Sequence, residues 1–191
     1  SACLNALTTC LLFQNSPLTL RMVLIDPKRV EFTKYNALPH LHGQIESDAE
    51  RVVSVLHWLV NEMQDRYQRF SKIGARHLED YNRHWKVGSS EYLPRIVTII
   101  DELADLMLFA PDDVEKSVCR LAQMARATGM HLILSTQRPS VDVVTGLIKA
   151  NFPARIGFAV SSGTDSRVIL DTVGAETLLG KGDMLYMSPD S

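Results

Sequence analysis

The stretch RIVTIIDELADLM, residues Arg95–Met107, decides the fold class of this chain. Its first half is rich in β-branched residues without polar alternation, which is typical of a strand buried on both faces in a parallel sheet. Two acids, Asp101 and Glu102, follow that run directly. Ligands of α/β proteins bind at the carboxyl ends of parallel strands, so we expect this acidic pair to lie at a binding edge.

Similar apolar runs recur along the chain, and helical patterns lie between them. The predicted strands are 21–26, 95–101, 131–136, 155–160 and 183–187. Alternation of strands and helices predicts a mainly parallel sheet with right-handed crossovers. The sequence therefore predicts one domain over residues 1–191, a three-layer α/β fold.

Two long helices are predicted between the strands, and the N-terminal residues 1–13 are read as a third. Apolar residues follow a 3.6-residue period over 48–73, with Ser47 and Glu50 as a capping box and Gly74 after the helix end. A second helix is expected over 114–128, capped by Asp112 or Asp113.

Composition excludes several classes of protein. The chain of 191 residues is 46% apolar and 22% charged, with a formal net charge of −2, as in an ordinary globular protein. Its three cysteines form no CxxC pair, which favours a reducing cytoplasm over a disulfide framework. No apolar run approaches the ~20 residues of a membrane span. His40 and His42 have no cysteine or carboxylate cluster beside them, so we do not interpret them as metal ligands.

The acidic pair suits nucleotide hydrolysis. In such a site Asp101 would hold Mg²⁺, through water, while Glu102 would polarise the water that attacks the γ-phosphate. The alternative is an acidic helix cap, because Asp and Glu favour the first turn of a helix.

Polar residues also end two other predicted strands. In HLILSTQRPS, Gln137 could hydrogen-bond both a γ-phosphate and the attacking water, or simply cap a loop. Asp26, followed by Pro27, could order the site, and a turn explains it equally well.

Longer segments resemble a known family. They are IDPKRVEFTKYNALPHL, IVTIIDELADLM, LAQMARATGMHLILSTQRPSVDVVTGLIKANFPARIGFAVSSGTDSRVILD and GAETLLGKGDMLY. Together they resemble the motor domain of the FtsK/SpoIIIE family, bacterial ATP-driven double-stranded DNA translocases that form hexameric rings. The stretch 136–151 is more specific than the acidic pair, which other RecA-like ATPases share. The resemblance implies a RecA-like P-loop NTPase core that uses ATP and Mg²⁺.

The resemblance also assigns the start of the chain. Ser1 aligns with the last, hydroxyl-bearing residue of the Gly-rich phosphate loop (Walker A) and would ligate Mg²⁺. The glycines and lysine of that loop, and the strand before them, would precede Ser1. We therefore expect chain 1–191 to lack the first strand of the sheet and to hydrolyse ATP at a negligible rate on its own.

Basic residues receive two further roles. Arg138, Arg155 and Arg167 are candidates for an arginine that reaches a neighbouring subunit's γ-phosphate, and we favour Arg167 because it opens a short helix after a strand. The alternative for each is a solvated or salt-bridged arginine. Arg138 and Lys149 are candidate contacts to the DNA backbone, although Lys149 is equally interpreted as a surface helix residue.

The resemblance implies an ATP-driven double-stranded DNA translocase in chromosome segregation and cell division, working as a homo-hexameric ring. Its motor would be cytoplasmic, in a parent protein anchored in the bacterial inner membrane through regions outside this chain. Two alternatives stay open: a protein-secretion ATPase of the same superfamily, and a non-catalytic ring-building module.

Overall fold

The computed structural model describes residues 2–189, and the chain divides into two compact units, one up to Ser135 and one from Thr136 onward. The prediction of a single domain is not tested by this division and stays a prediction.

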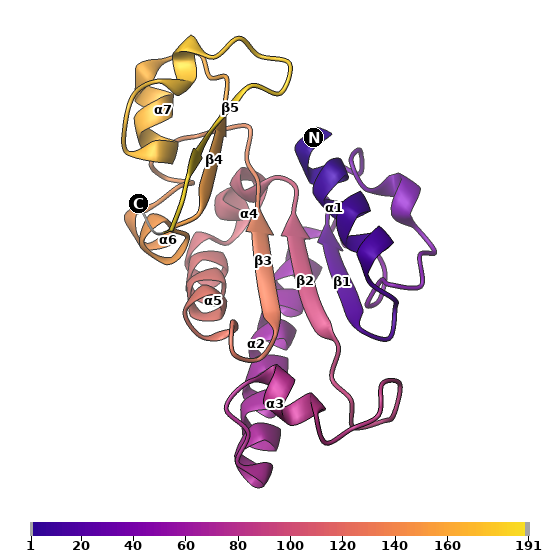
Figure 1. Cartoon of the computed structure of the whole chain (residues 1–191). Coiled ribbons are helices and arrows are strands. Elements are labelled where there is room, and N and C mark those ends of the chain that lie inside the picture. Colours follow the sequence, from indigo (N-terminus) through magenta and orange to yellow (C-terminus); the bar gives the residue numbers. More distant parts are fainter. Residues whose placement is uncertain (1, 190–191) are drawn as a thin grey trace. The chain divides into compact units, whose positions relative to one another are not determined.

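Three parallel strands form the sheet of the first unit, in the order β1–β2–β3: β1 (Leu20–Ile25), β2 (Arg95–Ile100) and β3 (Met130–Leu134). Ile25 pairs with Ile100 and Ile100 with Leu134, so the three strands end at one level, where their arrowheads point in Figure 1. The central strand β2 is buried from Ile96 to Ile100, as its uninterrupted apolar run predicts.

Helices cover both faces of this sheet (Figure 1). On one face α1 (Ala2–Gln14) inserts Leu4 among side chains of β1 and β2, including Met22, Leu24 and Ile99. On the other face lie α2 (Ala49–Ile73) and α5 (Pro111–Met124), which pack against each other. The predicted three-layer α/β arrangement with a parallel sheet is confirmed in this unit.

The predicted helix caps need correction. Asp48, not Ser47, caps α2, because its side chain accepts a hydrogen bond from the Arg51 backbone N–H. Ser47 instead accepts one from the Arg29 side chain, so no capping box forms with Glu50. Gly74 ends α2 in the left-handed conformation as predicted.

Helix α5 begins earlier than predicted. Pro111 opens it after Ala110, and both predicted caps, Asp112 and Asp113, lie inside the first turn. A proline suits the first helical position because its missing N–H has no partner to lose there. The acids of the first turn still face the positive end of the helix dipole.

Shorter elements complete the first unit and build the second. The first unit adds η1 (Thr33–Tyr35), α3 (Leu78–Asn82) and α4 (Leu103–Phe109); the second holds α6 (Gly146–Asn151), β4 (Arg155–Phe158), α7 (Gly163–Leu170), η2 (Ala175–Thr177) and β5 (Met184–Met187). Strands β4 and β5 pair antiparallel in a sheet of their own. The predicted mainly parallel sheet is that of the first unit, and β4 and β5 add an antiparallel pair.

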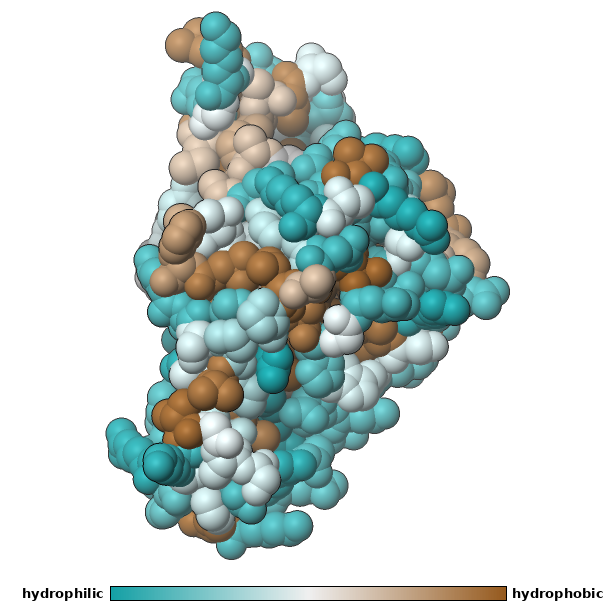
Figure 2. Space-filling view, turned by 90° about the vertical axis from the view of Figure 1, so that its right-hand side faces the viewer, coloured by the Kyte–Doolittle hydropathy of each residue, from teal (hydrophilic) through white to brown (hydrophobic). Residues whose placement is uncertain are grey.

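The surface mixes polar and apolar side chains. From the side in Figure 2, hydrophobic residues reach the surface as separate patches among hydrophilic ones. Within residues 2–189, no helix has the length and apolar character needed to cross a bilayer.

Candidate functional site

Three buried acids lie at the carboxyl edge of the first unit's sheet. Asp26 follows β1, and Asp101 and Glu102 follow β2; their residues are 1%, 1% and 0% exposed. The backbone fixes this edge, because the Asp101 N–H donates to Ile25 O at 3.0 Å and the Leu103 N–H to Ser135 O at 2.8 Å. The prediction that acids gather at the end of β2 is thus met by the geometry.

Of the three acids, Asp101 has the fewest hydrogen-bond partners. Both of its carboxylate oxygens are buried, and neither has a hydrogen-bond partner among the described residues. Burial, followed by the nearby charges of Glu31, Asp26 and Glu102, raises the pKa of Asp101 to about 6. A buried acid left without partners costs stability, so the site is chemically incomplete as folded.

Glu102 has partners on both oxygens. It is the N-cap of α4, and its Oε1 accepts a hydrogen bond from the Ala104 backbone N–H at 3.3 Å. Its Oε2 forms an ion pair with Lys28 Nζ at 3.1 Å. The helix-cap alternative considered from the sequence therefore describes part of what Glu102 does.

Asp26 shapes the loop that follows β1. Its Oδ2 accepts a hydrogen bond from the Phe32 backbone N–H at 3.0 Å, while its Oδ1 is buried without a hydrogen-bond partner in the described chain. The turn-forming interpretation of Asp26 is supported by the first contact. The unpartnered oxygen leaves room for a role in ordering the site.

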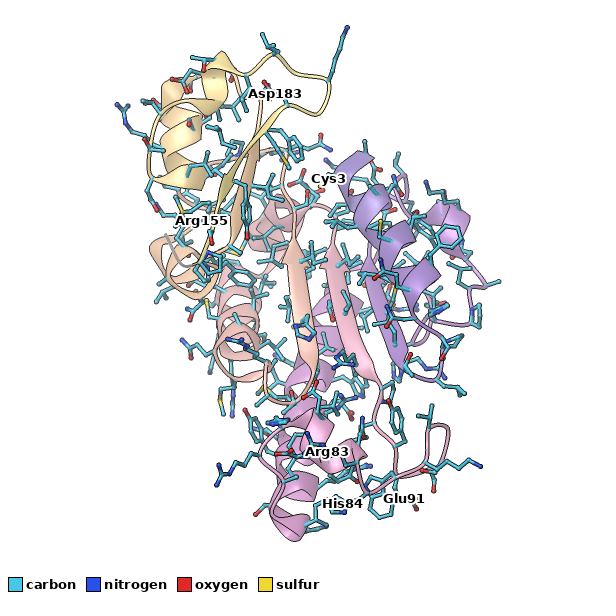
Figure 3. All side chains as sticks on the ribbon, viewed as in Figure 1. Cys3, Arg83, His84, Glu91, Arg155 and Asp183 are labelled. Carbon is cyan, nitrogen blue, oxygen red and sulfur yellow. The ribbon has the colours of Figure 1, made fainter. Side chains whose placement is uncertain are left out.

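The N-terminal end of α1 lies at the same edge of the sheet. Figure 3 labels Cys3, in the first turn of α1, near the ends of the strands where the arrowheads point. A helix N-terminus attracts anions through its free N–H groups and dipole. Ser1, predicted to ligate Mg²⁺, lies outside the described residues.

The carboxylates at this edge fit a Mg²⁺ ion whose remaining ligands come from a nucleotide and water. Among residues 2–189, no three His, Cys, Asp or Glu side chains gather closely enough to hold a metal ion alone. Mg²⁺ in nucleotide sites commonly takes one or two carboxylates, waters and phosphate oxygens. The two unpartnered oxygens of Asp101 supply such a carboxylate.

Lys28 is a site residue that sequence reasoning did not single out. It lies two residues after Asp26, and its partner Glu102 is 74 positions further along the chain. A basic residue just beyond a strand end was the available clue. Only the parallel pairing of β1 with β2 brings the two side chains together.

The other predicted residues belong to the second unit. Gln137 and Arg138 are exposed in the turn that follows Ser135, where the Arg138 backbone N–H donates to Thr136 Oγ1 at 3.1 Å. The proposed contact of Gln137 with the nucleotide stays a prediction.

Two of the predicted basic residues share one acid. Asp171 accepts hydrogen bonds from Lys149 Nζ and an Arg155 guanidinium nitrogen, each at 2.7 Å. These bonds lower the pKa of Asp171, first through Lys149 and then through Arg155. Arg155 also donates to the Ile169 carbonyl at 2.9 Å, so it ties β4 to α7. This contact favours the salt-bridged alternative for Arg155.

Arg167 differs from those two residues. It lies on α7, whose N-cap Ser162 accepts a hydrogen bond from the Asp165 N–H, as the predicted short helix requires. Its side chain is exposed and forms no hydrogen bond or ion pair within the described chain. Arg155, by contrast, is held by Asp171 and the Ile169 carbonyl.

Comparison with known proteins places these features in a family. Residues 1–141 match the model of the FtsK/SpoIIIE family. The chain is 55% identical to the DNA translocase FtsK of Caldanaerobacter subterraneus over 97% of its length, and 52% identical to the DNA translocase SpoIIIE of Bacillus subtilis over 98%. It spans 26% and 24% of those two proteins, about a quarter of each.

Solved structures agree on the fold. The pCW3 conjugation coupling protein TcpA, solved with ATPγS, matches 90% of this chain and 50% of its own with a TM-score of 0.77 and 26% identity. The type VII secretion ATPase EccC of Thermomonospora curvata matches 91% of this chain and 22% of its own, with a TM-score of 0.73 at 22% identity, which bears on the fold alone. The sequence, the parallel sheet with its acidic edge and the match over residues 1–141 together show that this chain belongs to the FtsK/SpoIIIE family.

Proposed function

We propose that this chain is part of an ATP-driven double-stranded DNA translocase, and that ATP is hydrolysed at the acidic edge of its parallel sheet. Asp101 carries the proposal: it is a buried carboxylate at a strand end, both of its oxygens lack a hydrogen-bond partner among the described residues, and its pKa is raised to about 6. Asp101 would hold the Mg²⁺ of a bound nucleotide, and that ion would supply positive charge at the γ-phosphate.

Asp101 and Glu102 divide the work in this proposal. Asp101 would hold Mg²⁺, and its buried position keeps the carboxylate fixed. Glu102 takes a proton from the attacking water while the water oxygen bonds to the γ-phosphorus and the bond to the ADP oxygen breaks. Ser1 is proposed as a further Mg²⁺ ligand, and Asp26 as the residue that orders the loop beside them.

Gln137 and Arg167 would act from the second unit. An amide side chain can orient the attacking water and sense the γ-phosphate, which is the role proposed for Gln137. Arg167 is exposed and unpaired, so its guanidinium is available to an anion. The anion proposed is the γ-phosphate of a neighbouring subunit in a homo-hexameric ring.

Arg138 and Lys149 are the proposed DNA contacts. Arg138 is exposed, and Lys149 donates to Asp171 and would exchange that ion pair for a DNA phosphate. Removing a basic side chain that contacts a DNA phosphate lowers the salt slope of DNA binding by about one unit. We therefore expect Arg138→Ala and Lys149→Ala each to reduce the slope by up to about that amount.

The cellular role follows the relatives' names. Proteins called DNA translocase FtsK, SpoIIIE and SftA are 51–55% identical to this chain. By analogy, we propose a cytoplasmic motor in chromosome segregation and cell division, joined to the inner membrane through other parts of the protein. A secretion ATPase shares the fold, as EccC does, so DNA dependence of the ATPase decides between the two.

The decisive experiment measures ATP turnover by the full-length protein that contains this chain. We expect Mg²⁺-dependent hydrolysis that double-stranded DNA stimulates. Glu102→Gln should lower turnover about 10²–10⁴-fold while nucleotide binding persists, because it removes only the proton acceptor. Glu91→Gln is the control: Glu91 is an exposed loop residue at the opposite end of the first unit from the strand ends (Figure 3). Equal loss in both variants, or no hydrolysis by the wild type, would refute the proposal.

A separate mixing experiment tests Arg167. Subunits carrying Arg167→Ala are mixed with subunits carrying Glu102→Gln, and turnover is followed across the mixing ratio. Recovery at mixed interfaces supports a role in the neighbour's site. If Arg167→Ala instead leaves turnover per bound DNA intact and reduces the salt slope of DNA binding, the anion it meets is DNA.

A further inference from the structure

The ion pair between Lys28 and Glu102 joins a partly exposed cation to a fully buried acid. Lys28 Nζ lies 3.1 Å from Glu102 Oε2, and the two side chains are 35% and 0% exposed. An ion pair with one buried member is screened less by water and salt than a surface pair. The contact therefore keeps Glu102 Oε2 beside a positive charge.

The loop after β1 holds Lys28 in place through its backbone. Asp26 anchors both ends of the turn: its Oδ2 accepts from the Phe32 N–H at 3.0 Å and its carbonyl accepts from the Arg29 N–H at 3.1 Å. Arg29 is in the left-handed region with φ 57°, and its side chain donates to Ser47 Oγ at 2.8 Å. The position of Lys28 is thus set by an ordered turn.

Glu102 itself is fixed from the other side. Its Oε1 accepts the Ala104 N–H as the N-cap of α4, and its Oε2 meets Lys28. A general base must offer an oxygen within about 2.6–3.2 Å of the proton that it accepts. Each carboxylate oxygen can accept a second hydrogen bond, but an ammonium 3.1 Å from Oε2 favours the ionised carboxylate and therefore opposes transfer of a proton from water to Glu102.

Lys28 is the partner more easily released. It is about one-third exposed and carries four flexible methylenes, so its ammonium can turn to solvent without disturbing the turn. Releasing the Ala104 N–H would instead uncap α4 and leave a buried backbone donor unsatisfied.

We infer that Lys28 is a positioning residue that restrains Glu102, and that hydrolysis becomes faster when the Lys28 ammonium leaves Glu102 Oε2. The inference rests on the proposed ATPase function of this edge. The inference goes beyond that function because it assigns to Lys28 the role of slowing ATP turnover when DNA is absent.

The first test compares basal and DNA-stimulated ATP turnover of the full-length protein. Lys28→Met keeps the side-chain length and removes the charge; we expect basal turnover to rise about threefold to tenfold, with little change in the stimulated rate. Lys28→Arg keeps the charge and should preserve the wild-type ratio of stimulated to basal rate. Lys34→Met, in the same loop but outside the ion pair, is the matched control.

Two outcomes would overturn the inference. One is an unchanged ratio in Lys28→Met. The other is a parallel fall of basal and stimulated rates, which would make Lys28 a residue that hydrolysis needs. Lys28→Gln serves as a second neutral variant and must agree with Lys28→Met.

A second test does not depend on activity. Melting temperatures without nucleotide are measured for wild type, Lys28→Met, Glu102→Gln and the double variant. The ion pair predicts that the two single losses do not add, whereas additive losses contradict it. If the wild type hydrolyses no ATP, the proposed function fails while this cycle still judges the ion pair. If ATP is hydrolysed but the ratio is unaltered, only the role of Lys28 fails.

Discussion

Two buried charged residues at opposite ends of the same sheet differ in their hydrogen-bond partners. Arg66, on α2, is 1% exposed and has three hydrogen bonds: it donates to Glu62 at 2.8 Å, to the Pro94 carbonyl at 2.8 Å and to the Thr128 carbonyl at 2.9 Å. Those carbonyls lie just before β2 and just before β3. Asp101, after β2, is equally buried and has no hydrogen-bond partner within the described residues.

The contrast separates a charge that serves the fold from one that serves a ligand. A buried charge needs an opposite charge and hydrogen bonds, or it costs several kcal/mol. Arg66 has both, and in return it ties a helix to the starts of two strands. Asp101 has no hydrogen-bond partner among the described residues. Burial lowers the pKa of Arg66 and raises the pKa of Asp101 to about 6, so the two residues differ in their hydrogen bonds and not in their desolvation. Each prediction below tests one side of this contrast.

The largest expected effect is at Arg66. Arg66→Met leaves Glu62 and two carbonyls without their donor, so we expect a loss of about 3–5 kcal/mol in the free energy of unfolding. Arg69→Met is the matched control, since Arg69 pairs with Asp65 at 2.7 Å on the same helix but is 41% exposed. That control should cost less than about 1 kcal/mol. Urea denaturation of the two variants measures both values, and equal losses would contradict the contrast.

The next effect concerns the turn beside Thr128. Gly129 has φ 72°, and a Cβ there would lie 2.2 Å from Leu78 Cδ2. Gly129→Ala should therefore cost about 2–4 kcal/mol, combining left-handed strain with overpacking. Gly74 has nearly the same φ, 71°, and open space around its Cβ position. Gly74→Ala should cost only about 1 kcal/mol, and a similar cost at both glycines would argue against the Leu78 contact.

At the other end, Asp101→Asn should stabilise the nucleotide-free protein. The pKa of Asp101 is about 6 in the folded protein, above its ordinary value of 3.8. Between these two pH values the carboxyl group therefore takes up a proton when the chain folds. Wild-type stability from this group is present below about pH 4 and is lost as pH rises through about 6. Asparagine does not titrate, so the variant should gain about 1–3 kcal/mol relative to wild type between pH 4 and pH 7.5.

Melting curves without Mg²⁺ at both pH values measure that difference. Because the comparison uses the change in this difference between the two pH values, any pH-independent cost of burying the asparagine amide cancels. A difference between variant and wild type that does not change with pH would mean that Asp101 is satisfied in solution.

The smallest effect is expected at Asp171 in the second unit. Asp171 is in the left-handed region, which asparagine also tolerates, so Asp171→Asn removes charge without straining the backbone. The acid is half-exposed, and we expect a loss below about 1 kcal/mol that shrinks in high salt. Because bonds from Lys149 and Arg155 lower its pKa, this contribution should vanish as pH falls through the folded-state value. Calorimetry at low and high salt checks it; a salt-independent loss would point to a structural role beyond the ion pairs.

Local patterns in the sequence predicted the first unit well. The β-branched run of β2 and the 3.6-residue period of α2 each reflect burial over many consecutive residues, so single exceptions do not obscure them. Cap positions were predicted less well, because Ser47 and Asp48 both make good caps and their neighbours decide between them. Strands β4 and β5 were found, but their antiparallel pairing was not, since four-residue strands carry no mark of their partner.

The candidate site divides in the same way. That Asp101 and Glu102 end a buried strand follows from the sequence alone, because their place depends only on the run before them. That Asp101 is unpartnered, that Glu102 caps α4 and that Lys28 reaches it from 74 residues away depend on how strands align. Burial and pairing are properties of the assembled sheet, and only the tertiary structure decides which charges it satisfies and which it leaves for a ligand.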